Sequence, residues 1–113
     1  MKNSLITSIL CAALCVSLNV TAATTWTEVD TIARIYPTNG NNVLVQPDSS
    51  SARIDPEGCS NRTWYVLDAT TTRFQQHYQA MLTALAAGKR MRFLLSGCIG
   101  NYPKVIQLQL YRE

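Results

Sequence analysis

The stretch that decides the fold is TTTRFQQHYQAMLTALAAGKRMRFLLS, residues 70–96. Its apolar residues recur at intervals of three and four, which is the spacing of one face of a helix. They are Phe74, Tyr78, Met81, Leu82 and Leu85. The run MRFLLS that follows is apolar and short, as in a strand. The stretch therefore predicts one helix that leads directly into a strand.

Residues at both ends of the expected helix favour the same boundaries. Thr72 and Gln75 have the spacing of a capping box at the start. Gly88 stands where a left-handed C-terminal cap is wanted, followed by Lys89 at the negative end of the helix dipole. We expect a helix over residues 73–87.

Five alternating or β-branched segments surround this helix, three before it and two after it. The five expected strands are 32–37, 42–47, 63–68, 91–96 and 104–112. The first places Ile32, Arg34 and Tyr36 on one face, and the last alternates glutamines with Ile and Leu. Between the first two strands, Asn39-Gly40 is a strong hairpin signal.

This order predicts a mainly β domain with one helix over residues 24–113. Strand, strand, strand, helix, strand, strand is the order of an OB-fold, a small five-stranded Greek-key barrel. The alternative is an open antiparallel sheet with the helix packed on one face. A ferredoxin-like sandwich is excluded because it needs a helix between its first two strands.

Residues 1–23 resemble a secretory signal peptide. Lys2 is followed by an apolar run from about Leu5 to Leu18 and then by small residues up to Ala23. A membrane anchor is the weaker alternative, because the run is short and Thr and Ser interrupt it. We expect cleavage near Ala23 and a secreted or periplasmic protein without a membrane span.

Charge and cysteine content narrow the chemistry of the mature chain. Without Lys2, the mature chain has nine basic and seven acidic residues. The basic residues are scattered apart from one cluster, Lys89, Arg90 and Arg92, which is expected to be a solvated strand end, so no nucleic-acid partner is expected. Only Cys59 and Cys98 remain after cleavage, and in an oxidising compartment they are expected to form a disulfide that ties down the polar loop 48–62. Two cysteines and one histidine do not make a structural zinc site.

No catalytic constellation is visible, so we expect a protein that is not an enzyme and needs no cofactor or metal. His77 is the single histidine and is expected to flank the apolar helix face. Asp55 and Glu57, on either side of Pro56, are a candidate calcium or acid–base pair, but a solvated turn is the favoured interpretation.

Aromatic side chains near loops are the candidate ligand-binding residues. An aromatic ring can stack on the apolar face of a sugar while polar neighbours bind its hydroxyl groups. The candidates are Trp26, Tyr36, Asn101 and Tyr102; the disulfide should hold the last two at one end of the barrel.

Three stretches resemble the B subunits of AB-type bacterial toxins, in the branch of subtilase cytotoxin and the pertussis-like typhoid toxin. They are the start TTWTE, the helix-to-strand passage FQQHYQAMLTALAAGKRMRF, and the Tyr-Pro of GNYPKVIQLQL. The first strand has no evident counterpart of the serine with which those subunits bind sialic acid, so no glycan-binding residue is carried over.

The resemblance implies an OB-fold that assembles as a ring of five, binds host-cell glycans and delivers a separate enzymatic A subunit. A glycan, that A subunit and further copies of the chain are thus the expected partners. The alternative function is a small periplasmic or extracellular inhibitor or assembly factor that binds a protein.

Overall fold

The computed structural model describes residues 23–113, so all but the last residue of the predicted signal peptide lies outside the described residues. No helix in this part of the chain is long and apolar enough to cross a bilayer. The elements are β1 (Thr25–Trp26), β2 (Asp30–Pro37), β3 (Asn42–Pro47), the 3-10 helix η2 (Ser50–Ala52), β4 (Tyr65–Asp68), α1 (Phe74–Ala87), β5 (Arg90–Ile99) and β6 (Tyr102–Leu110).

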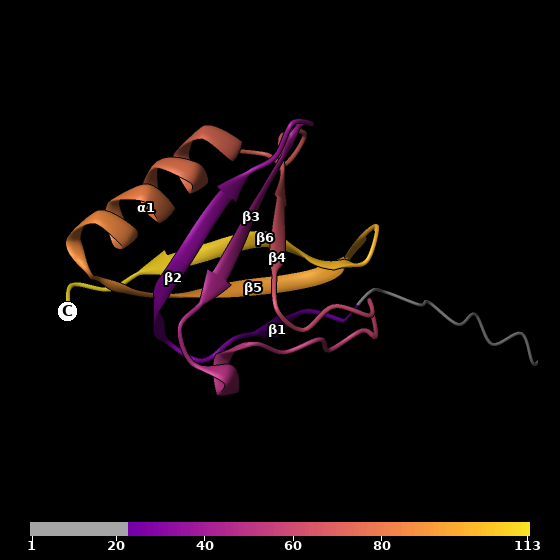
Figure 1. Cartoon of the computed structure of the whole chain (residues 1–113), viewed down its shortest axis with the longest axis horizontal. Coiled ribbons are helices and arrows are strands. Elements are labelled where there is room, and N and C mark those ends of the chain that lie inside the picture. The colour runs from indigo at the N-terminus through magenta and orange to yellow at the C-terminus, as the bar shows by residue number, and fades with distance from the viewer. Residues whose placement is uncertain (1–22) are drawn as a thin grey trace, which may run out of the picture.

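The six strands form one mixed sheet in the order β1-β5-β2-β3-β4-β6, with β5 also paired to β6. In Figure 1, β2, β3 and β4 run across the β5–β6 hairpin, and α1 lies beside β2. Two seams are short: β4 and β6 meet at the single parallel pair Val66↔Lys104, and β2 meets β5 only at Asp30 and Thr31. The predicted mainly β fold with one helix is confirmed, and the weak seams fit the open-sheet alternative.

The hairpins differ in how closely the sequence located them. The β2–β3 hairpin turns over Asn39-Gly40 as predicted, and Thr38 N donates to Asn42 O at 3.1 Å. The β5–β6 hairpin is tighter than predicted, because both strands continue into the segment 97–103. Cys98 therefore pairs with Pro103 inside the ladder instead of lying in a turn. The two-residue strand β1, which pairs with β5, was not predicted.

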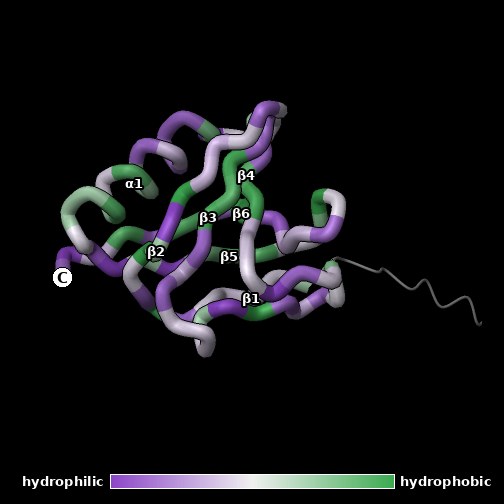
Figure 2. Tube along the Cα trace, in the orientation of Figure 1, coloured by the Kyte–Doolittle hydropathy of each residue, from purple (hydrophilic) through white to green (hydrophobic). Residues whose placement is uncertain are grey.

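The core lies between the strands β2, β3 and β4, the β5–β6 hairpin that they cross, and α1. Figure 2 shows hydrophobic segments along β3, β4, β5 and β6, whereas the β2–β3 tip and much of the loop 48–62 are hydrophilic. The buried core residues are Ile32, Val43, Val45, Tyr65, Leu67, Met81, Ala84, Met91, Phe93, Leu95 and Val105. Burial of this apolar set is the main favourable contribution to folding.

Helix α1 begins at Phe74, one residue later than predicted, and ends at Ala87 as predicted. Of the predicted apolar face, Phe74, Tyr78 and Met81 pack in or against the core. Arg73 occupies the N-cap in a left-handed conformation and no side chain caps the helix, so the capping box is wrong. Gly88 adopts the predicted left-handed C-terminal cap, with φ of 65°. Met81 and Ala84 face the core, while Leu82 and Leu85 remain 42% and 39% exposed.

Tyr65 connects the core to the loop 48–62. Its ring packs edge-on against Phe93 with ring centroids 5.8 Å apart. Its hydroxyl donates to Ala52 O and accepts from Ile54 N at 2.8 Å. Burial raises the pKa of this hydroxyl to about 12. One fully buried side chain thus fixes the loop by two hydrogen bonds.

Asp30 fixes the start of the same loop. Its carboxylate accepts from Ser49 N at 2.6 Å, from Ser49 Oγ at 2.7 Å and from Thr31 N at 2.8 Å. Partial burial by itself raises the pKa of Asp30, but these hydrogen bonds and the charge of Arg53 outweigh it, so the pKa lies below 3.8.

Replacing Tyr65 by phenylalanine keeps the ring in the core and removes both hydrogen bonds to the loop. We expect Tyr65→Phe to lower the free energy of unfolding by about 1–3 kcal/mol, because two largely buried backbone groups lose their partner. Urea denaturation measures the change. Tyr36→Phe is the matched control, since Tyr36 is 55% exposed, and equal stability losses in the two variants would contradict the proposed role.

The lowered pKa of Asp30 makes stability depend on acidity in a defined direction. The contribution of the carboxylate is fully present above pH 3.8 and is lost as the pH falls through the lower pKa of the folded state. We expect Asp30→Asn to be less stable than the wild type at neutral pH, with the difference shrinking on acidification below pH 3.8. Unfolding curves recorded in that series test this; a constant difference would contradict it.

Candidate functional site

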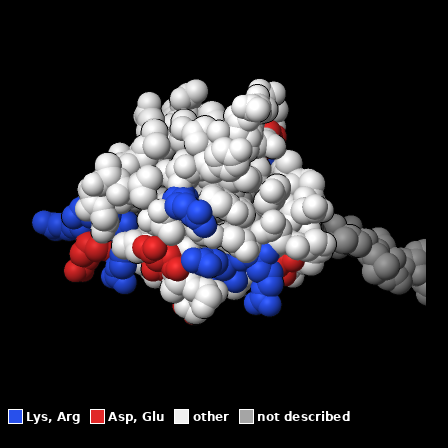
Figure 3. Space-filling model, in the orientation of Figure 1, with Lys and Arg blue, Asp and Glu red and all other residues white. Residues whose placement is uncertain are grey.

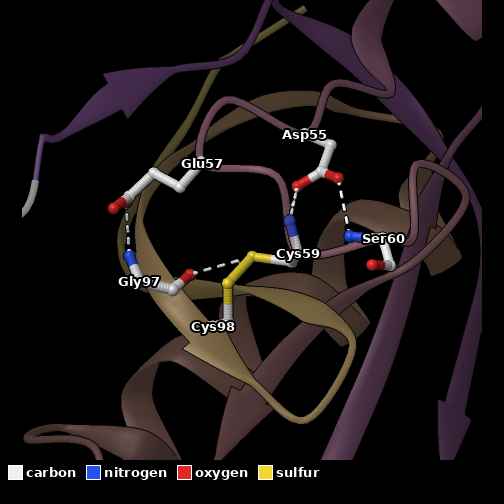
Figure 4. The surroundings of a disulfide bond; sticks show 6 residues. All are labelled: Asp55, Glu57, Cys59, Ser60, Gly97 and Cys98. Carbon is white, nitrogen blue, oxygen red and sulfur yellow. Dashed lines mark hydrogen bonds between the residues drawn. A yellow bond between two sulfur atoms is a disulfide. The ribbon is translucent and has the colours of Figure 1, made fainter.

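The predicted disulfide between Cys59 and Cys98 is present. Their Cα atoms lie 5.7 Å apart, and the bond spans 39 positions in the chain. Figure 4 shows how it joins the loop 48–62 to the end of β5. The loop that carries Cys59 is thereby fixed to the β5–β6 hairpin.

Asp55 and Glu57, the candidate calcium or acid–base pair, instead accept hydrogen bonds from backbone amides beside the disulfide. Asp55 accepts from Cys59 N at 2.6 Å and from Ser60 N at 2.9 Å, and Glu57 accepts from Gly97 N (Figure 4). Each of these bonds orders the backbone beside the disulfide. Their geometry therefore indicates a structural role for both carboxylates.

His77 shows no catalytic arrangement among the described residues. Its Nδ1 atom is buried without a hydrogen-bond partner. Burial, and then the charge of Arg73, lower the pKa of His77 below 6.5. That the protein is not an enzyme and needs no cofactor therefore stays a prediction from the sequence.

The four candidate ligand-binding residues lie in three different places. Trp26 is on β1 opposite Leu94 of β5. Tyr36 is on β2, near the β2–β3 turn. Asn101 and Tyr102 are at the β5–β6 turn, where Asn101 is exposed and Tyr102 is half-buried. The strand pairing thus does not gather them into one site.

Tyr36 belongs to a cluster on the outer face of β2, β3 and β4, which we call the Tyr36 cluster: Arg34, Tyr36, Gln46 and Trp64. Arg34 Nε donates to Gln46 Oε1 at 2.9 Å, and the guanidinium lies 5.2 Å from the centre of the Trp64 ring. The Tyr36 and Trp64 rings are 6.3 Å apart. Tyr36 presents an exposed aromatic ring beside ordered polar groups.

A β-bulge turns this cluster outward. The register of β2 on β3 shifts between Ile32 and Arg34, where one extra residue is accommodated. Ile32 therefore faces the core although it was predicted to share a face with Arg34 and Tyr36. Beyond the bulge Ile35 packs against the core, and Arg34 and Tyr36 are exposed.

Trp26 belongs to a second cluster, the Trp26 cluster, on the outer face of β1, β5 and β6: Trp26, Arg92, Gln109 and Tyr111. The Arg92 guanidinium lies 4.2 Å from the centre of the Trp26 ring. Arg92 Nε donates to Gln109 Oε1 at 2.8 Å, and the Tyr111 hydroxyl is 3.4 Å from the same oxygen. Gln109 is exposed and Trp26 is half-buried.

The two clusters have the same internal construction. The chain contains two tryptophans, and each lies beside an arginine whose Nε atom is bound to a glutamine on the neighbouring strand. Cation–π contacts of this kind are found roughly once per 70–80 residues in proteins. Tyr36 and Trp26 are candidate residues predicted from the sequence, whereas their arginine and glutamine partners were not predicted as part of a site.

A shallow open hollow lies near the loop 48–62, lined by Ser50, Arg53, Arg62 and Thr63. Arg53 is committed to the backbone there, because its Nε and Nη2 atoms donate to Pro47 O and Asp48 O at 2.9 and 2.7 Å. Arg53 therefore has few donors left in this hollow with which to bind a ligand.

No protein-family model, curated protein or solved structure matches this chain. The resemblance to toxin B subunits accordingly stays a prediction.

Removing the disulfide should destabilise the mature protein strongly. In the chain-entropy model, cross-linking residues 39 positions apart is worth about 4 kcal/mol. We expect the double variant Cys59→Ser, Cys98→Ser to lose a free energy of unfolding of this order in urea denaturation. Thiol alkylation of the unreduced wild type is the companion measurement, and rapid labelling of either cysteine would contradict the bond.

Proposed function

We propose that this protein is a secreted or periplasmic binding protein without catalytic activity that recognises carbohydrate through the Tyr36 cluster. The observation that carries the proposal is the exposed Tyr36 ring next to Trp64, with Arg34 and Gln46 ordered beside them. An aromatic ring provides a face for the C–H groups of a sugar, and the exposed Arg34 beside it supplies hydrogen bonds to the sugar's hydroxyl groups. Gln46 is only 3% exposed, so its role is to hold Arg34 in place.

Two features of the cluster favour binding over plain surface packing. Arg34, Tyr36 and Gln46 stand on the paired strands β2 and β3, and Trp64 directly precedes the first paired residue of β4. Leu44 and Val66 are buried, which gives the exposed ring a rigid base. A surface that is ordered before binding loses less entropy when the ligand arrives.

The resemblance to toxin B subunits supports the wider proposal of a host-cell glycan as ligand, a ring of five copies and an enzymatic A subunit as cargo. The disulfide is compatible with an exported protein, because such bonds persist in oxidising compartments. Export after cleavage near Ala23 is part of the same proposal.

Glycan-array binding by the purified chain 24–113 tests this function. We expect binding to at least one class of glycan, weakened about tenfold or more by Tyr36→Ala, because truncating a central aromatic contact removes much of the binding energy. Tyr102→Ala is the matched control, since it removes another aromatic candidate at the β5–β6 turn. Silence across sialylated and neutral glycans, with a monomer by light scattering, would overturn the proposal.

A second function is favoured by a different observation. Helix α1 carries no Asp, Glu, Lys or Arg, and Leu82 and Leu85 stay exposed. Figure 3 shows the charged side chains mainly in a band below α1. Depletion of charge is typical of the core of a protein interface, so this face supports an inhibitor or assembly factor. A stoichiometric protein partner lost on replacing Leu82 and Leu85 by asparagine would favour it.

A further inference from the structure

The Trp26 cluster differs from the Tyr36 cluster in what it presents to solvent. The Arg92 guanidinium lies over the Trp26 ring at 4.2 Å, closer than the 5.2 Å between Arg34 and Trp64. The guanidinium therefore covers an indole face that a sugar would otherwise occupy. Here no strongly exposed tyrosine stands beside the pair, since Tyr111 is half-buried.

In the described part of the chain, the polar groups of this cluster that remain without a partner are hydrogen-bond donors. Gln109 Oε1 already accepts from Arg92 Nε and Tyr111 Oη, so the amide group Nε2 is the part of Gln109 left to bind a ligand. Within residues 23–113 the hydrogen bonds of Arg92 use Nε alone, which leaves both Nη atoms. Three donors on two neighbouring strands thus remain, at the paired positions Arg92↔Gln109.

The charged residues around the cluster are mainly basic. Arg90 precedes Arg92 by two residues, so both belong to the same face of β5; Arg90 is exposed, and its Nε atom donates to the main-chain oxygen of the acidic residue Glu113 at 3.1 Å. Glu28, the acidic residue nearest to Trp26 in the chain, accepts a hydrogen bond from Ser51 Oγ at 3.1 Å. An arginine held over an indole ring and fixed at Nε loses little freedom when it binds an oxyanion through its Nη atoms.

We propose that the Trp26 cluster is a binding site for the sulfate ester groups of a sulfated polysaccharide, separate from the carbohydrate site proposed at the Tyr36 cluster. Arg92 Nη1 and Nη2 bind two oxygens of one sulfate, and Gln109 Nε2 donates to a third. Arg90 attracts the polyanion to the same strand face. The proposal stands without glycan binding at the Tyr36 cluster.

The two tryptophans allow each cluster to report on itself. In Trp64→Phe the fluorescence comes from Trp26, and in Trp26→Phe it comes from Trp64. We expect dextran sulfate to change the emission of Trp64→Phe saturably, uncharged dextran of the same length to leave it unchanged, and Trp26→Phe to show no change with either. Binding should weaken with rising salt, as contacts between a cation and a polyanion do.

Substitutions separate a shaped site from general charge attraction. On the Trp64→Phe background, Arg92→Gln should weaken binding about tenfold or more, and Arg92→Lys should fail to restore it, because a lysine keeps the charge without the planar fork. Arg34→Gln removes the same charge from the other cluster and is the matched control. Equal effects of Arg92→Gln and Arg34→Gln, or full rescue by Arg92→Lys, would overturn the site.

Membrane binding is the competing source of oxyanions. Vesicles of neutral phospholipid containing anionic phosphatidylglycerol serve as the probe, with the same variants. Arg92-dependent binding to these vesicles without binding to dextran sulfate would overturn the assignment to a polysaccharide. Binding to dextran sulfate, with no binding to these vesicles, would support it.

Discussion

The placement of Tyr65 is the constraint on which the rest of the structure depends. Its ring belongs to the core, and its hydroxyl holds the backbone of Ala52 and Ile54 in a loop with few apolar side chains of its own. Hydrophobic burial alone leaves such a loop without a fixed position, because polar residues gain little from leaving water. Trp64 precedes Tyr65 directly, so the contact that anchors the loop also fixes where that indole stands.

The disulfide and Tyr65 act on the same loop from two sides. Cys59 ties its far end to β5, with Asp55 and Glu57 binding the amides nearby, and Asp30 orders its beginning through Ser49. Each constraint by itself leaves part of the segment free to move. Together they convert a long polar connection into a fixed surface next to the strands that carry the aromatic clusters.

Local rules predicted α1, the Asn39-Gly40 hairpin and the disulfide, because periodicity, a turn dipeptide and a count of cysteines are properties of short segments or of composition. The predicted capping box of Thr72 and Gln75 is wrong, because Arg73 is the N-cap residue and no side chain caps the helix. The arginine and glutamine partners of the tryptophans could not be predicted in this way. Arg34 and Trp64 meet only after β2, β3 and β4 have paired in a particular register, which no single segment contains.

Bulges decide which side chains of these strands face outward. In β2 a strict alternation would place Ile32 and Arg34 on one face, so either the charge would be buried or an isoleucine would be exposed. The extra residue between them lets Ile32 and Ile35 pack in or against the core while Arg34 and Tyr36 lie outside. The register shift between Leu94 and Leu95 does the same for β6, where Val105 is buried although Gln107 and Gln109 are exposed. The irregularity in β2–β3 and the one at Leu94 and Leu95 in β5–β6 therefore let each strand pair contribute both to the core and to an outward cluster.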